Sequence, residues 1–229
     1  MTAIKCFILT RLSDALAIET AEGDSSVLMM KVAKERLAWA AKERKGFEPG
    51  QKSRFQGLED FMNPEYLLWL FHRREHLLLI QLQGTMDRDI HIGGYSLFHT
   101  WQMRVSDQVQ HLAKAYIERV CLEQFLLEGK SNTTIENVVV KLAILFAVDV
   151  VHSELGWFLT NRVIELEQGN RVSEILRELC GTGVYGIANW APYLVDAFSI
   201  PEHLLPPAAR NWVAYNEVNN EGELRNISY

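Results

Sequence analysis

The sequence predicts an all-α protein, a helical bundle preceded by one separate helix. Apolar residues recur at helical spacing along most of the 229 residues, and no segment shows the apolar–polar alternation of a half-buried strand. Only six prolines are present, and four of them fall in the last forty residues, which leaves room for long helices before that point.

The first predicted helix follows Asp24 and runs to about Lys45, where Gly46 ends it. Its apolar positions recur at helical spacing: Leu28, Val32, Leu37 and Ala41. The polar segment that follows, with its glycines and proline, predicts a loop over residues 46–61.

Asn63 and Pro64 predict the start of a second helix, because an N-cap asparagine followed by proline in the first turn is a strong start signal. This helix is predicted to end at about Gly84, and a loop containing Gly93-Gly94 follows. A long helix is then predicted over residues 96–127, with apolar residues near one face.

The hydroxyl-rich stretch Asn132-Thr133-Thr134 predicts the cap of a further helix that runs to about Thr160. Its apolar core, residues 138–151, is interrupted by a lysine and is too short to span a bilayer, so it predicts a buried helix. Shorter helices are predicted over 172–180 and 188–198, and the last thirty residues predict short turns.

The composition excludes several classes of protein. Net charge is −6 with no basic block, which argues against nucleic acid or anionic membranes as general partners. Three scattered cysteines, Cys6, Cys121 and Cys180, show no metal-binding spacing and predict reduced thiols in an intracellular protein.

One short motif suggests zinc chemistry. His72, Glu75 and His76 match H-x-x-E-H, the pattern of one class of zinc protease, with both histidines on one helix face. A catalytic zinc needs three protein ligands, so a third would have to come from downstream, for instance from Glu118 or Glu154. Because so short a pattern arises easily by chance in helices, we expect no metal site here.

A second candidate lies just before the first helix, where Glu22 and Asp24 flank Gly23. Asp24 is explained by helix capping, because acids near a helix N-terminus are favourable. Glu22 precedes the glycine and cannot cap the same helix. A carboxylate on a loop that Gly23 allows to turn sharply can project into a cleft and act as a base.

These residues resemble the acyl-CoA oxidase family. The stretch Thr20–Leu28 is similar to the T-[FY]-E-G-D-N-T-V-L motif near the end of the family's flavin domain. Later segments resemble the family's C-terminal helical domain in order and spacing: Phe71–Leu78, Ala115–Val120, Leu155–Thr160, Leu194–Phe198 and Ile200–Leu205. The resemblance covers nearly everything after about Arg11. It implies that the helix with the H-x-x-E-H motif has a structural role and carries no zinc.

The resemblance implies that Glu22 is the catalytic base of an FAD-dependent oxidation of fatty acyl-CoA to trans-2-enoyl-CoA, with production of hydrogen peroxide. Gly23 and Asp24 would lie beside the flavin, Asp24 near its phosphates. It also implies a homodimer and a peroxisomal location in a eukaryote or a cytoplasmic one otherwise, although the last residues are not a Ser-Lys-Leu type signal.

The same resemblance divides the chain into a remnant of the flavin-side helical domain at 1–46, a linker at 47–62 and the C-terminal helical domain at 63–229. Because the chain begins where the family's flavin domain is ending, we expect a truncated oxidase that can be inactive alone. The alternative is a non-catalytic dimerisation module that pairs with a full-length acyl-CoA oxidase.

Overall fold

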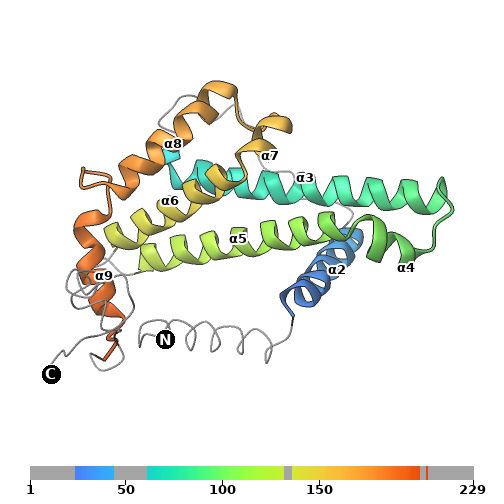
Figure 1. Ribbon diagram of the computed structural model, residues 1–229, viewed down its shortest axis with the longest axis horizontal. Coiled ribbons are helices and arrows are strands. Elements are labelled where there is room, and N and C mark those ends of the chain that lie inside the picture. The colour runs from blue at the N-terminus through green and yellow to red at the C-terminus, as the bar shows by residue number, and fades with distance from the viewer. Residues whose placement is uncertain (1–23, 44–60, 132–135, 202–204, 206–229) are drawn as a thin grey trace, which may run out of the picture. The chain divides into compact units, whose positions relative to one another are not determined.

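The computed structural model describes residues 24–43, 61–131, 136–201 and 205, and all regular structure in these ranges is helical (Figure 1). The helices are α2 (Ser25–Glu43), α3 (Pro64–His91), α4 (Leu97–His99), α5 (Ser106–Ser131), α6 (Glu136–Ser153), α7 (Leu155–Thr160), α8 (Leu166–Cys180) and α9 (Ala191–Ala197). A π-helical turn, Thr100–Arg104, joins α4 to α5, and a 3-10 turn, Ala188–Trp190, precedes α9. The predicted all-α class is confirmed.

Residues 26–191 form the larger of two compact units, which holds α3 to α8 and all of α2 except Ser25. Within the described ranges, no helix is both long and apolar enough to cross a membrane.

The start of α3 is as predicted, but its end is not. The Asn63 side-chain oxygen accepts a hydrogen bond from the Glu65 backbone N–H at 2.9 Å, and Pro64 occupies the first turn. The helix then continues past Gly84 to His91. A glycine inside a helix costs only about 1 kcal/mol, and the part of α3 beyond Gly84 makes tertiary contacts of its own, among them Asp89 with Arg104.

The turn after α3 uses both glycines of the predicted loop. Gly94 adopts φ +68°, which favours glycine, and a Cβ at Gly93 would lie 2.7 Å from the Asp89 carbonyl oxygen. The helix predicted over 96–127 starts where expected, and Ser96 caps it: its hydroxyl accepts from the His99 N–H at 3.2 Å.

That predicted helix is nevertheless divided by a break at Val105, whose φ of −126° and ψ of 13° are not helical. Arg104 Nε donates to Asp89 Oδ2 at 2.6 Å, and its guanidinium lies 4.5 Å from the centre of the Tyr95 ring. This contact pins the π-helical turn against α3, and α5 then restarts at Ser106 and extends to Ser131. The expected single helix was wrong because it ignored this tertiary contact.

The helix predicted to run to Thr160 is also two helices, α6 and α7, with its expected cap at 132–134 outside the described residues. The break falls at Glu154, whose φ of −104° and ψ of 19° end α6. Further along, α8 begins at Leu166, earlier than predicted, where Gln168 Oε1 accepts from the Glu165 N–H at 3.0 Å.

The long helices α3 and α5 run antiparallel and are the axis of the unit (Figure 1). The first core cluster joins the N-terminal half of α3 and the C-terminal half of α5 to α6–α8; its members include Tyr66, Leu70, Leu122, Val148, Phe158 and Ile175. The second joins the other halves of α3 and α5 to α2; its members include Ala33, Leu79, Leu82, Val109 and Leu112. Each large apolar side chain buried here stabilises the fold by about 1.5–3 kcal/mol.

Candidate functional site

A layer of charged residues lies between the two core clusters, halfway along the α3–α5 contact. α3 contributes Arg74 and Glu75, and α5 contributes Glu118 and Arg119. Arg74 Nη1 donates to Glu118 Oε2, and Arg119 Nε donates to Glu75 Oε2. Arg74, Glu75 and Arg119 are each less than a tenth exposed. Buried charges are costly unless paired in this way, so the layer requires all of its members.

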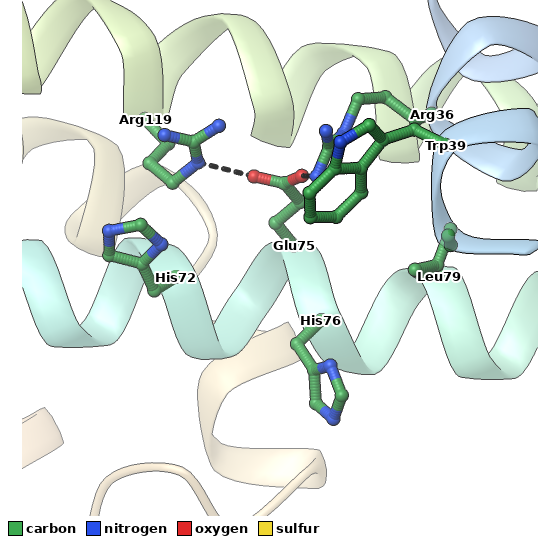
Figure 2. A pocket seen from close by; sticks show the side chains of 8 residues that line it. Arg36, Trp39, His72, Glu75, His76, Leu79 and Arg119 are labelled. Carbon is green, nitrogen blue, oxygen red and sulfur yellow. Dashed lines mark hydrogen bonds and ion pairs between the residues drawn. The ribbon is translucent and has the colours of Figure 1, made fainter. Parts of the chain in front are cut away.

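Helix α2 joins this charged layer through Arg36. Arg36 Nη2 lies 2.5 Å from Glu75 Oε1, so the carboxylate of Glu75 bridges arginines of two different helices (Figure 2). The Arg36 guanidinium also lies 4.4 Å from the centre of the Trp39 ring and 4.8 Å from that of Tyr116. These aromatic contacts suit a cation that is largely removed from water.

Each half of the layer is electrically neutral. Arg119 Nη1 lies 2.6 Å from Glu123 Oε2, so the first half balances two arginines against two glutamates: Arg36, Arg119, Glu75 and Glu123. In the second half Glu154 Oε1 lies 3.0 Å from Arg74 Nη2 and 2.7 Å from Lys114 Nζ. That half also balances two cations against two anions: Arg74, Lys114, Glu118 and Glu154. The layer therefore carries no surplus charge.

The protonation of these groups follows from burial and pairing. Burial lowers the pKa of His72 below 6.5, and the Arg119 charge lowers it further, although His72 Nε2 lies 3.1 Å from Glu123 Oε1. Burial alone would raise the pKa of Glu154, but the Lys114 hydrogen bond and the Arg74 charge bring it below its usual value. At neutral pH His72 is therefore uncharged and Glu154 ionised.

A cavity of about 210 Å³ opens beside the first half of the layer, lined by Arg36, Trp39, Ala40, His72, Glu75, His76, Leu79 and Arg119. Figure 2 shows Glu75 directed toward Arg36 and Arg119, while His76 points away from both. The cavity thus opens onto groups whose charges are already paired.

The residues of the H-x-x-E-H motif take part in this pairing. Both carboxylate oxygens of Glu75 accept from arginines, and the two expected third ligands, Glu118 and Glu154, are both bound to Arg74. In the part of the chain that the structure describes, no three histidine, cysteine, aspartate or glutamate side chains are grouped to hold a metal ion. What the motif supplies here is a buried ion pair.

Of the three residues predicted at a flavin site, only Asp24 is described; Glu22 and Gly23 lie outside the described residues. Asp24 is exposed and directly precedes α2, which begins at Ser25 as the capping argument predicts. The first turn of α2 is tied to α5, because Gln110 Nε2 donates to the Ser26 carbonyl oxygen at 2.9 Å.

The pairing of these charged residues into one layer was not predicted from the sequence. The signal was available, because Arg-Glu at 74–75 and Glu-Arg at 118–119 each interrupt the apolar stripe of a long helix. Charged residues are rarely buried unless they are paired, so charges at core positions of two helices that pack together are expected to pair with one another. Arg36 carried no such signal, since a single arginine on an amphipathic helix is ordinarily solvated.

Comparison with known proteins identifies the family of this chain. The sequence model of the acyl-CoA oxidase family matches residues 63–208. An acyl-coenzyme A oxidase-like protein of Mus musculus is 26% identical over 215 residues, covering 84% of this chain and 33% of that protein. The peroxisomal acyl-coenzyme A oxidase 2 of Arabidopsis thaliana is 26% identical over 222 residues, covering 87% of this chain and 31% of that protein.

Solved structures agree on the fold. Acyl-CoA oxidase 1 from Yarrowia lipolytica superposes with a TM-score of 0.71 at 15% identity, covering 94% of this chain and 37% of that structure. Acyl-CoA oxidase 3 from the same organism gives a TM-score of 0.65 at 17% identity, covering 92% and 35%. The chain spans about a third of the length of the curated relatives it matches. Because the family's sequence pattern extends over well more than half of it, this chain belongs to the acyl-CoA oxidase family.

Proposed function

We propose that this chain takes part in the FAD-dependent oxidation of fatty acyl-CoA to trans-2-enoyl-CoA, with production of hydrogen peroxide. The observation that best supports this is the family match over residues 63–208, with the Thr-x-Glu-Gly-Asp motif placed directly before α2. The matched relative from Arabidopsis thaliana is named a peroxisomal oxidase, which supports a peroxisomal setting in a eukaryote.

In the proposed reaction Glu22 is the base. Its carboxylate takes the proton from the α-carbon of the thioester, while the β-carbon gives up a hydride and the α–β double bond forms. FAD, when bound, accepts that hydride and passes the electrons to dioxygen. A base raised in basicity by a dry cleft is suited to this step, and such bases contribute about 10²- to 10⁴-fold to a rate.

The described residues fit one edge of a flavin site. Asp24, Ser25 and Ser26 are all exposed at the N-terminal end of the 19-residue helix α2. The N-terminal end of a helix carries a partial positive charge, which favours a phosphate group nearby. We propose that Gly23 and Asp24 lie along this edge, and that a homodimer completes the site, with 1–46 as the flavin-side segment, 47–62 as linker and 63–229 as the C-terminal helical domain.

The test is to purify the chain, add FAD and a series of fatty acyl-CoA substrates, and measure bound flavin by absorbance and peroxide with a coupled peroxidase. We expect flavin binding, and peroxide production that falls at least about 100-fold in Glu22→Gln. Glu19→Gln, a neighbouring acid outside the motif, is the matched control and should keep full activity.

Failure to bind FAD and to produce peroxide from any acyl-CoA would contradict the proposal for this chain. If the same inactive chain then formed a stable complex with a full-length acyl-CoA oxidase, the dimerisation role would replace it. Activity that survives in Glu22→Gln would show that another group is the base.

A further inference from the structure

A second cavity, of about 400 Å³, lies at the α4 end of the α3–α5 pair and shares no lining residue with the cavity at the charged layer. Its lining residues come from three parts of the larger unit, namely α2, the C-terminal half of α3, and α4 with the π-helical turn. We call it the apolar pocket; its lining residues are Lys34, Leu37, Met86, Leu97, Phe98 and Trp101.

The lining of the apolar pocket is unusual for a surface of this acidic chain. Five of its six residues are apolar, and no acid is among them. Phe98 and Leu97 are 76% and 61% exposed, although large apolar side chains are ordinarily kept from water. Pockets of 300–1,000 Å³ with apolar walls and a few placed polar groups are typical of small-molecule sites.

Lys34 supplies the single charge of this lining. Its side chain is exposed and makes no hydrogen bond or ion pair with any residue that the structure describes. The other cations near the middle of the molecule are already balanced by glutamates, so Lys34 differs from them. An unbalanced ammonium at an apolar cavity suits a ligand with an apolar body and one negative group.

The volume limits the size of that ligand. At about 30 Å³ for each water molecule, the cavity corresponds to roughly 13 waters, and a methylene group is of comparable size. An unbranched chain of about eight to twelve carbons would fill it. A strongly polar ligand would leave Leu37, Phe98 and Trp101 without apolar contacts.

We infer that the apolar pocket binds an unesterified straight-chain carboxylate, with the chain against Leu37, Phe98 and Trp101 and the carboxylate at Lys34 Nζ. This site goes beyond the proposed oxidation and does not depend on it, because binding requires neither flavin nor the Glu22 motif. Its failure and the failure of the proposed function are therefore distinguishable.

The test measures binding of decanoate to the full chain by isothermal titration calorimetry, with octanoate and decanol as comparison ligands. We expect saturable one-to-one binding of decanoate, and a loss of about fourfold in affinity for each methylene removed. Lys34→Met should weaken decanoate about two- to fivefold, as for an exposed ion pair, and leave decanol unchanged. Phe98→Ala should weaken both ligands.

Lys31→Met is the matched control, since Lys31 is an exposed lysine of the same helix that does not line the pocket. Circular dichroism of each variant separates lost binding from lost folding; Phe98 is so exposed that its truncation should leave the fold intact. No saturable decanoate binding to the folded chain would overturn the inference. Equal losses of decanoate affinity in Lys34→Met and Lys31→Met would also overturn it. So would a higher affinity for decanoyl-CoA than for decanoate that Lys34→Met leaves unchanged.

Discussion

Glu75 and Arg119 form a buried ion pair at the middle of the α3–α5 contact, and the second oxygen of Glu75 holds Arg36 of α2 at 2.5 Å. One carboxylate therefore links three helices. In the sequence α2 directly follows the Glu22-Gly23-Asp24 motif, in which Glu22 is the proposed base.

We expect Glu75→Gln to destabilise the fold by about 3 kcal/mol, because it leaves Arg36 and Arg119 without a shared counter-charge. Urea unfolding followed by circular dichroism gives the change in free energy. The control is Glu174→Gln, which removes an exposed partner of Arg171 at 3.7 Å and should cost less than about 0.5 kcal/mol. Equal effects of the two variants would show that the charged layer is no more than a surface pairing.

We expect His72 to make the fold less stable as pH falls from 7 to 5. Its pKa in the folded chain lies below the ordinary value of 6.5, so the unfolded chain binds the proton first, and stability present above 6.5 is lost on acidification. The charged groups facing His72 are Glu123, Arg119 and Glu75.

The measurement is the free energy of unfolding at several pH values for the wild type, His72→Gln and the control His152→Gln. His152 is exposed and its ring lies 3.1 Å from Ser173 Oγ, away from the charged layer. His72→Gln should reduce the slope by a few tenths of a kcal/mol per pH unit, on the order that partial solvent screening allows. A steeper fall of the free energy of unfolding with decreasing pH in His72→Gln would contradict a lowered pKa for His72.

We expect Gly186→Ala to destabilise the segment after α8. A Cβ at Gly186 would lie 2.0 Å from the Gly181 carbonyl oxygen. Because that oxygen is a backbone atom, it cannot move away unless the chain itself moves. The cost should be about 1–3 kcal/mol, as for other overpacked sites, measured by thermal or urea unfolding. Gly183→Ala in the same turn meets nothing within 4 Å and should change stability by less than about 0.5 kcal/mol.

For α3, the local signals in the sequence predicted the start of the helix better than its end. Asn63 was recognised as a cap, and its side chain makes the expected bond to the Glu65 backbone N–H. This interaction spans two residues, so the sequence alone contains it. Gly84 was read as a helix end because its conformational cost is local, whereas the contacts that carry α3 past it come from elsewhere in the chain.

The breaks at Val105 and Glu154 have the same origin. The residue before Val105, Arg104, bonds to Asp89, and Glu154 bonds to Arg74 and Lys114, all of which are distant in sequence. A helical periodicity cannot reveal a break that a tertiary contact imposes. The site shows the same division: Asp24 stands at the start of α2 as its capping role predicts, whereas the roles of Glu22 and Gly23 stay predictions.

The order of charges in the layer has one more consequence. If α5 slid one helical turn against α3, Arg74 would meet Lys114 in one direction, and Glu75 would meet Glu123 in the other. Apolar packing alone discriminates poorly between such neighbouring registers, because leucines and valines fill both core clusters. Either slip would place like charges together in a site removed from water. The charged layer thus specifies a single register between α3 and α5.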